Sequence, residues 1–556
     1  MNRRLSSSLA ALLFCLAGVS ASAGAQTCTG LCLQQVQCPN PAVTTSISGT
    51  VYAPNGVDPL PNVLVYVPNS AVQPFTAGVA CSVPVSGSPL VSTTTGADGK
   101  FVLANMPVGS NIPVVIQAGK WRRQLTVPSV AACTTTPVSA AASRFPKNQS
   151  EGDIPRIAVV TGSADATECV LRKIGIDDAE FTNPGVGGRI SIYLGNGSII
   201  DAQTPLESTL WSNQATLNQY DMTMMACQGN SSNPSAADQQ RLVNYTNAGG
   251  RIFGTHYAYS WLVNNAPFSG VATWSVNQTS PANQTGFVDM TFPKGQQLAQ
   301  WLQTVGASTT LGQIPLSALK LDQTGVVAPT KSWLTIGNPP AVMQFTFNTP
   351  VGTPAAQQCG RVLFNEYHVE NSSTTGSVFP ASCVAGAMTA QEKLLEFDLF
   401  DLTNVLAPDQ QTVTYVGNGN TGGSVPVDGN LYANGATVTV LGNTGGLVKT
   451  GYTFKGWNTA ADGTGTNYPG NGSTTFIIGV PNVVLYANWA GAACALDVDG
   501  NNTIDALTDG LMILRAMFGL TGVSVTTGAV GLNPTRADWT AIRSFLNGSC
   551  GTHFAQ

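Results

Sequence analysis

The sequence predicts a multi-domain, β-rich chain with four folded units behind an export signal. Three observations support this prediction. At 556 residues the chain is longer than a single hydrophobic core supports. Charged residues make up only 10% of the composition and glycine is abundant, with 59 residues, which favours exposed β-rich modules over helical cytosolic enzymes. Period-two hydrophobic patterns are interrupted by one central stretch in which strands and helices alternate.

Residues 1–25 have the features of a cleaved signal peptide. Arg3 and Arg4 give a positive start, residues 9–19 form a short apolar run, and residues 23–25 (AGA) form a small-residue cleavage site. The apolar run is too short to span a bilayer, and no later stretch has 18 continuous apolar residues. We therefore expect a secreted, extracellular or cell-envelope protein without a transmembrane anchor.

The charge pattern argues against nucleic acid as a partner. The chain has 24 basic and 29 acidic residues, a formal net charge of −5, and its basic cluster is confined to residues 120–123 (KWRR). Nucleic-acid binding requires a basic surface that neutralises phosphates, and this composition does not provide one.

The cysteines predict a disulfide-bonded protein. Signal cleavage removes Cys15 and leaves eleven cysteines in an oxidising compartment, where disulfides are the default. Grouping them by domain predicts the pairs Cys81–Cys133, Cys359–Cys383 and Cys494–Cys550, with Cys169–Cys227 as a further candidate. Sequence alone does not determine the connectivity, and the odd count leaves at least one thiol free or intermolecular.

A Cys-rich leader over residues 26–44 precedes the first unit, residues 45–143, which we expect to be a small antiparallel β-sandwich. Ile47 and Val51 lie on one side of a period-two pattern, and residues 98–99 (DG) mark a tight turn. Three segments resemble a carboxypeptidase regulatory-like domain: 47–51 (ISGTV), 61–65 (PNVLV) and 96–101 (GADGKF). The resemblance implies a non-catalytic sandwich attached to a secreted protein.

The second unit, residues 144–407, alternates short apolar strands with helices. Strands are expected at residues 157–160, 221–226, 251–254 and 361–367, and helices at residues 235–247 and 389–404. This alternation favours a parallel α/β sheet with crossover helices.

Reactive side chains fall at the strand ends of this unit, where open parallel sheets bind ligands. Cys227 follows one strand, His256 follows a second, and His368 and Glu370 follow a third. Only three histidines exist in the chain, and two of them lie at these ends. The four residues are our candidate catalytic residues.

Residues 248–256 (AGGRIFGTH) and 368–370 (HVE) resemble the class I glutamine amidotransferase-like superfamily, especially its trehalose-utilisation-type branch. The resemblance implies a flavodoxin-like fold and a His-x-Glu pair. The elbow residue is His256 instead of the cysteine nucleophile, which favours a non-catalytic or ligand-binding domain and leaves enzymatic activity open. Two alternatives remain: metal-assisted or general-base chemistry at His256, His368 and Glu370, and thiol chemistry at Cys227.

The third unit, residues 411–490, returns to β patterns with Gly-rich turns. Residues 451–458 (GYTFKGWN) and 485–489 (LYANW) closely resemble an internalin B-type repeat. The resemblance implies a β-grasp module of a bacterial surface protein. Trp457 and Trp489 are among the aromatic anchors expected for its small core.

The fourth unit, residues 491–556, predicts an α-helical calcium-loop module. Oxygen-bearing side chains recur at loop positions 1, 3, 5 and 9, and calcium requires about six to eight oxygens. The predicted ligands are Asp497, Asp499, Asn501, Thr503 through its carbonyl, Asp505 and Asp509. Ile504 is expected to anchor the loop in the core. Asn502 occupies the position where glycine normally turns the loop, and Thr508 occupies position 12.

Residues 497–501 (DVDGN) and 511–515 (LMILR) resemble half of a dockerin type I module. The resemblance implies docking onto a scaffold or surface partner. The second half, near residues 533–538 (NPTRAD), lacks an intact loop, so calcium-dependent folding is the principal expectation.

These patterns predict a secreted or cell-surface display or adhesion-type binding protein with a calcium-stabilised C-terminal module. The expected partner is a surface or scaffold protein or a polysaccharide. One alternative is an extracellular hydrolase with its site in residues 144–407. The other is a docking subunit of a polysaccharide-degrading assembly.

Overall fold

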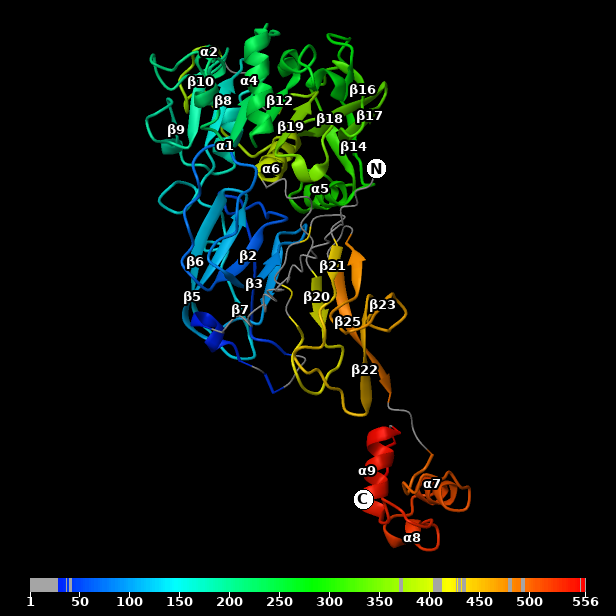
Figure 1. The fold of residues 1–556 in the computed structure, drawn as a ribbon. Coiled ribbons are helices and arrows are strands. Elements are labelled where there is room, and N and C mark those ends of the chain that lie inside the picture. Colours follow the sequence, from blue (N-terminus) through cyan, green and yellow to red (C-terminus); the bar gives the residue numbers. More distant parts are fainter. Residues whose placement is uncertain are drawn as a thin grey trace, which may run out of the picture.

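The computed structural model describes residues 29–36, 38–39, 43–369, 374–403, 413–426, 428, 432, 437–478, 483–491, 496–550 and 552–555. The predicted signal peptide, residues 1–25, lies outside this range. The described residues form several sheets and a smaller number of helices (Figure 1). The prediction of a multi-domain, strand-rich chain is confirmed. Among the described residues, no helix has the length and apolar character needed to cross a membrane.

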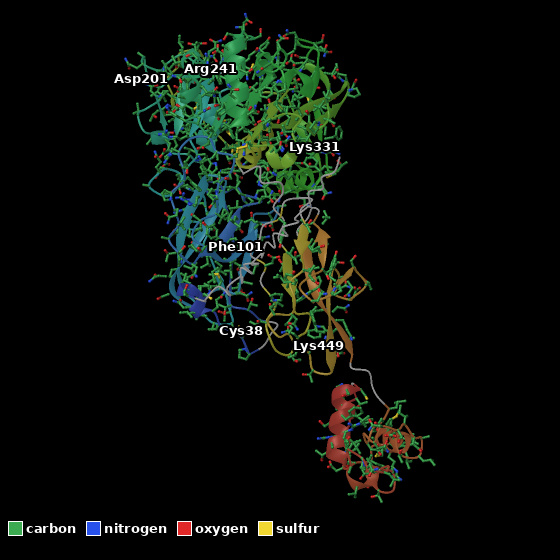
Figure 2. The ribbon with its side chains drawn as sticks, viewed as in Figure 1. Cys38, Phe101, Asp201, Arg241, Lys331 and Lys449 are labelled. Carbon is green, nitrogen blue, oxygen red and sulfur yellow. A yellow bond between two sulfur atoms is a disulfide. The ribbon has the colours of Figure 1, made fainter. Side chains whose placement is uncertain are left out.

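Seven strands form the N-terminal unit. They are β1 (Ser46–Thr50), β2 (Leu64–Pro68), β3 (Pro89–Thr94), β4 (Lys100–Ala104), β5 (Gly109–Ala118), β6 (Trp121–Val130) and β7 (Thr135–Pro137). One sheet has the order β4-β1-β7 and the other the order β3-β2-β5-β6. Phe101 (Figure 2) and Ile47 from the first sheet pack with Val65 from the second. The prediction that all strands of this unit pair antiparallel is wrong. Strand β7 follows β6 of the other sheet along the chain and pairs parallel to β1.

A ten-stranded sheet forms the central unit. Its strands are β8 (Ile157–Thr161), β9 (Phe181–Thr182), β10 (Ile190–Leu194), β11 (Met222–Met225), β12 (Arg251–Thr255), β14 (Gln284–Val288), β15 (Gln313–Leu316), β17 (Lys331–Gly337), β18 (Pro340–Thr349) and β19 (Gly360–Asn365). The order is β15-β14-β17-β18-β19-β12-β11-β8-β10-β9. The six strands from β19 to β9 pair in parallel, whereas β18, β17, β14 and β15 extend the sheet with antiparallel pairs that were not predicted. A separate pair joins β13 (Ala272–Trp274) to β16 (Gln323–Val326).

The helices of the central unit are α1 (Thr167–Lys173), α2 (Ser208–Trp211), α3 (Gln214–Leu217), α4 (Ala236–Asn247), α5 (Pro293–Thr304) and α6 (Ala390–Thr403). Helix α4 begins where predicted, because the side chain of Ser235 accepts a hydrogen bond from the backbone N–H of Asp238 at 3.1 Å. Helix α6 is buried along nearly its whole length, which places it between the central sheet and the N-terminal unit.

The N-terminal and central units share one hydrophobic core. The ring of Phe400 on α6 lies 5.2 Å from that of Trp121 and 5.6 Å from that of Phe145. Trp301 on α5 donates a hydrogen bond from Nε1 to the carbonyl oxygen of Pro59 at 2.5 Å. The two units therefore stabilise each other.

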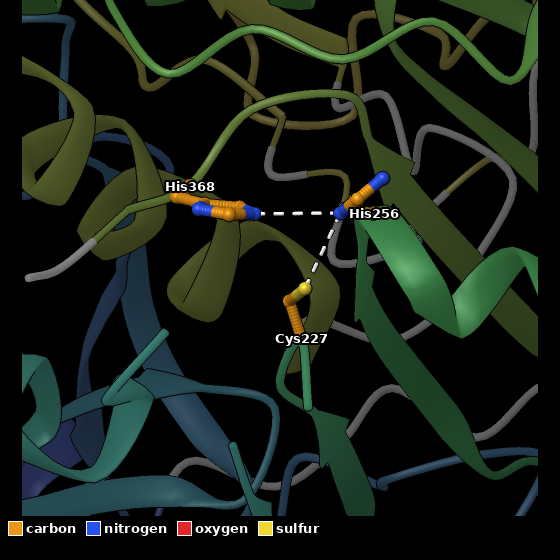
Figure 3. A group of neighbouring side chains, drawn as sticks. All are labelled: Cys227, His256 and His368. Atoms are coloured by element: carbon orange, nitrogen blue, oxygen red, sulfur yellow. Dashed lines mark hydrogen bonds between the residues drawn. The ribbon is translucent and has the colours of Figure 1, made fainter. Parts of the chain in front are cut away.

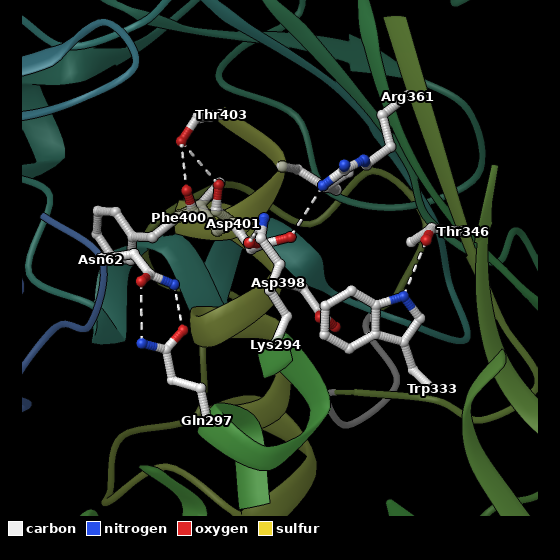
Figure 4. A network of polar contacts seen from close by, with 12 residues as sticks. Asn62, Lys294, Gln297, Trp333, Thr346, Arg361, Asp398, Phe400, Asp401 and Thr403 are labelled. Carbon is white, nitrogen blue, oxygen red and sulfur yellow. Dashed lines mark hydrogen bonds and ion pairs between the residues drawn. The ribbon is translucent and has the colours of Figure 1, made fainter. Parts of the chain in front are cut away.

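A polar network accompanies this contact (Figure 4). The side-chain amides of Asn62 and Gln297 exchange hydrogen bonds across it. Asp401 accepts from Lys294 at 2.5 Å and from Arg361 at 3.1 Å. Burial alone would raise the pKa of Asp401, but the two cations hold it below the usual value.

The disulfides in the described residues are Cys38–Cys133, Cys81–Cys359 and Cys169–Cys383. The predicted pairs Cys81–Cys133, Cys359–Cys383 and Cys169–Cys227 are therefore wrong, and Cys227 is free. The grouping assumed that each bridge closes within one domain, whereas Cys81–Cys359 joins two units whose shared core brings the sulfurs together. Cys550 is disulfide-bonded, and its predicted partner Cys494 lies outside the described residues.

An acid-sensitive ion pair lies at the start of the central unit, before β8. Arg144 donates two hydrogen bonds of 2.6 Å to the carboxylate of Glu151, which also accepts from the backbone N–H of Lys147. These contacts, led by Arg144, lower the pKa of Glu151 to about 2. The folded pKa lies below the unfolded value, so this stabilisation is present above about pH 4.5 and is lost as the pH falls toward 2.

We predict that Glu151→Gln lowers the free energy of unfolding by about 1–3 kcal/mol at pH 7 and by progressively less below about pH 4.5. Urea unfolding at pH 7, 5 and 3 measures this difference. Asp98→Asn is the control, because the Asp98–Lys100 pair is exposed and its loss should change stability little. An equal loss for Glu151→Gln at pH 7 and pH 3 would contradict the prediction.

The C-terminal part contains two smaller units. The first has the strands β20 (Val413–Val416), β21 (Thr437–Thr439), β22 (Tyr452–Asn458), β23 (Asn467–Tyr468), β24 (Thr475–Ile477) and β25 (Val483–Gly491). Its core surrounds Trp457, which is fully buried and contacts the ring of Tyr415 at 4.7 Å. The second contains the helices α7 (Asp509–Met517), α8 (Val523–Thr526) and α9 (Trp539–Ser549).

Candidate functional site

Three of the four candidate catalytic residues meet at the carboxyl ends of adjacent strands. Cys227 follows β11, His256 directly follows β12 and His368 follows β19 (Figure 3). These strands are parallel neighbours in the sheet, so their ends open on the same edge. Glu370, the fourth candidate, lies outside the described residues.

The donor atoms of the three side chains are close together. Cys227 Sγ lies 3.3 Å from His256 Nδ1, and His368 Nε2 lies 3.5 Å from the same nitrogen. One nitrogen or sulfur atom from each residue falls within 4.8 Å of the other two. His256 has a φ of +37°, which non-glycine residues rarely adopt, at the turn from β12 into the 3₁₀ helix η3 (His256–Trp261). Such strain persists only where surrounding contacts hold it in place.

Burial keeps all three groups neutral at pH 7. It raises the pKa of Cys227 to about 11, and it lowers the pKa of His368 to about 4, with the charge of Lys320 adding to the effect. Burial and then the neighbouring His368 lower the pKa of His256 to about 3. A thiolate–imidazolium pair, which activates cysteine nucleophiles, is therefore not the resting state of this cluster.

Asp322 is a member of the site that sequence reasoning missed. Its Oδ2 atom lies 3.5 Å from His256 Nε2, and its side chain is 1% exposed. Asp322 Oδ1 accepts from the backbone N–H of Asn277 at 2.8 Å, while the backbone N–H of Asp322 donates to Glu366 at 3.1 Å. Asp322 lies in the segment before β16, far from the three strand ends in sequence, and no local motif marks it.

The acidic loop near the C-terminus is a second candidate site. Carboxylate oxygens of Asp497, Asp499 and Asp509 lie within 4.8 Å of one another. Backbone N–H groups turn the loop around them: Asp497 accepts from residues 500, 501 and 502, and Asp509 accepts from residues 498, 499 and 505. The hydrogen bonds that Asp509 accepts hold its pKa below the usual value, although burial opposes the shift.

Residues that follow α8 donate hydrogen bonds to the loop. Arg536 donates from Nε to the carbonyl oxygen of Val498 at 2.8 Å and from Nη2 to that of Asp497 at 2.7 Å. The backbone N–H of Gly531 donates to Asp499 Oδ2 at 2.6 Å. The second half, which lacks an intact loop of its own, thus braces the first.

The structure of the acidic loop differs from the prediction at Ile504 and Asp505. Ile504, expected to anchor the loop, is 68% exposed, its neighbours over residues 502–507 are exposed as well, and Val498 is fully buried in the core in its place. Asn502 has a φ of +67°, in the left-handed region that asparagine tolerates. Asp505 lies outside the group of three converging carboxylates. The other two predicted ligands, Asn501 and Thr503, lie in the turn of the loop. There Asn501 Oδ1 accepts a hydrogen bond from the backbone N–H of Thr503 at 2.8 Å.

Comparison with known proteins identifies one domain. A family model described as the Listeria-Bacteroides repeat domain matches residues 412–488. The match lies within residues 411–490, where a repeat unit was predicted, and shows a Listeria-Bacteroides repeat domain there. A curated relative, a Gly-rich membrane protein of Evansella cellulosilytica, is 36% identical over 93 residues, which are 16% of this chain and 10% of the relative. The similarity therefore spans about a tenth of that protein.

Two solved structures show distant likenesses. A ThuA-like protein of Bacteroides uniformis is 12% identical, with 46% of this chain and 92% of that chain covered and a TM-score of 0.25. A type II cohesin-X-dockerin complex of Acetivibrio cellulolyticus is 16% identical, with 24% and 85% covered and a TM-score of 0.15. TM-scores this low establish neither a shared fold nor a shared function.

Proposed function

We propose that this chain is a secreted binding protein of the cell surface, whose C-terminal unit is held by calcium and docks onto a protein partner. The converging carboxylates of Asp497, Asp499 and Asp509 carry the proposal. Calcium prefers oxygen ligands from a tight loop, and a helix, α7, follows the loop directly. Without a cation, three carboxylates at this spacing repel one another.

An exposed apolar face supports the protein partner. Leu514, Met517 and Phe518 lie three and four residues apart on α7 and at its end, so they share one side of the helix. Met517 is 70% exposed and Phe518 78%, whereas Met512 and Ala516 turn into the core. A small unit rarely exposes such a set without a partner to cover it. An apolar helix face of this kind is the type that docks into an apolar groove of a protein partner.

The disulfides and the repeat domain support the location. Bridges such as Cys81–Cys359 form and persist outside the reducing cytosol. The match of residues 412–488 to the Listeria-Bacteroides repeat domain supports the proposal that the chain is a bacterial surface protein. The proposal expects the mature chain to begin after Ala25.

The test has two arms on the full chain. In the first, calcium is titrated while heat of binding and thermal unfolding are recorded. We expect one site in the 10⁻⁵ to 10⁻³ M range, roughly that of weak sensors and extracellular modules. Asp499→Asn should abolish it, and Asp462→Asn, in an exposed turn of the repeat domain, should not. Equal binding by wild type and Asp499→Asn would refute the calcium site.

In the second arm, the labelled chain is added to the producing cells with calcium or with a chelator. We expect saturable binding that the chelator reverses and that Met517→Lys with Phe518→Lys removes. Leu532→Lys, at an 88% exposed position outside α7, is the matched control. Cell binding that is unchanged by the chelator and by the α7 variants would refute docking through this unit. Recovery of the native chain in the cytosol with residues 1–25 intact would refute secretion.

A further inference from the structure

The side chains of Cys227, His256 and His368 bring three potential metal-ligand atoms close to one another. Hydrogen bonding among the three side chains does not require all three atoms to converge. Three elements far apart in the sequence deliver a sulfur and two imidazole nitrogens to one point, and His256 adopts a strained backbone to do so. The set lies at the sheet edge where parallel strands end, apart from the calcium loop and from the α7 face.

We propose that Cys227 Sγ, His256 Nδ1 and His368 Nε2 bind a single divalent cation of the zinc class. In a tetrahedral zinc site the metal lies about 2.3 Å from sulfur and about 2.0–2.1 Å from nitrogen, which separates neighbouring ligand atoms by about 3.3–3.6 Å. The two distances that meet at His256 Nδ1 are 3.3 and 3.5 Å. One sulfur and two imidazole nitrogens also suit zinc over the oxygen-preferring calcium or magnesium.

Asp322 gives independent support. Its Oδ2 atom is buried and has no hydrogen-bond partner, yet it lies 3.5 Å from His256 Nε2, the nitrogen opposite the cluster. Metal-binding histidines commonly donate their other N–H to a carboxylate, which sets the tautomer and orients the ring. A proton on Nε2 leaves the Nδ1 lone pair facing Cys227 and His368. Asp322 is therefore a positioning residue for the metal site.

Three protein ligands leave the fourth tetrahedral position open. Structural zinc sites have four protein ligands, whereas sites that bind water or substrate have three. His368 is only partly buried, so the open position lies on the side of the cluster nearest solvent. The expected occupant is a water molecule, or an anionic or thiol ligand that replaces it.

The experiment uses the full chain after treatment with a chelator, with Zn²⁺ and Co²⁺ as probes. Co²⁺ bound to a thiolate produces a near-ultraviolet charge-transfer band, which reports the cysteine directly. We expect one Co²⁺ per chain, displaced by Zn²⁺, with the band lost in Cys227→Ser and metal affinity strongly reduced in His368→Gln. Asp322→Asn should weaken metal binding by about 10–100-fold and retain the band at saturation.

Two control variants separate this site from others. His553→Gln removes the remaining histidine, which is exposed near the C-terminus, and Asp499→Asn disrupts the calcium loop. Both should bind Co²⁺ like the wild type. Circular dichroism checks whether each variant is folded, and His368→Gln, at a partly exposed position, keeps the test valid if Cys227→Ser unfolds. A charge-transfer band that persists in Cys227→Ser, or unchanged affinity in a folded His368→Gln variant, would overturn the proposal, as would a wild type that takes up neither metal.

Discussion

Replacing Lys393 by methionine should lower the free energy of unfolding of the N-terminal and central units by about 3–5 kcal/mol, because it leaves a buried carboxylate without its cation. Lys393 on α6 forms an ion pair with Asp58 of the N-terminal unit, whose side chain is 4% exposed. The side-chain amide of Asn55 also donates to Asp58, at 2.7 Å. Neutral donors do not compensate a buried charge as a cation does.

Glu396 provides the matched control for this prediction. It lies 3.6 Å from Lys393 and is fully buried, and burial, together with the nearby Asp58, raises its pKa well above the usual value. Burial and Asp58 therefore favour the uncharged form of Glu396, and Glu396→Gln, which keeps the side chain neutral and nearly unchanged in shape, should cost less than about 1 kcal/mol. Denaturant unfolding of both variants at pH 7 measures the difference. Equal losses of stability in Lys393→Met and Glu396→Gln would contradict the prediction, because they would show that the Lys393–Asp58 ion pair adds no stability beyond that of any other buried polar group on α6.

Removing the Cys81–Cys359 disulfide by the double change to serine should cost about 4–5 kcal/mol. The bridge joins residues 278 positions apart, and a cross-link over a long loop removes much of the conformational entropy of the unfolded chain. It also links the N-terminal unit to β19, since Cys359 directly precedes that strand. Chemical denaturation under non-reducing conditions measures the cost.

The Cys38–Cys133 double variant is the comparison for this bridge, because it closes a shorter separation of 95 residues within the N-terminal part. The chain-entropy relation predicts that its cost is lower by about 1 kcal/mol. A cost below about 1 kcal/mol for the Cys81–Cys359 variant would contradict the prediction. It would mean that the denatured chain without the disulfide still keeps residues 81 and 359 close together, so that the cross-link removes little entropy.

Local patterns predicted the segments whose structure depends on near neighbours. Ser235 caps α4 because its hydroxyl reaches an N–H three residues away, and the alternation of strands and helices placed Cys227, His256 and His368 at strand ends. The antiparallel extension from β18 to β15 escaped prediction, because its place in the sheet depends on the pairing of β18 with β19 and of β14 with β17, which the local pattern of each strand does not determine.

The sequence by itself determined the order of the units, the repeat domain, the acidic loop and the strand ends that carry the reactive side chains. Only the tertiary structure decided which cysteines pair, that Asp322 faces His256, and that Val498 rather than Ile504 anchors the acidic loop. The reason is physical: periodicity and capping act over a few residues, whereas disulfides and buried polar contacts depend on which distant surfaces share a core.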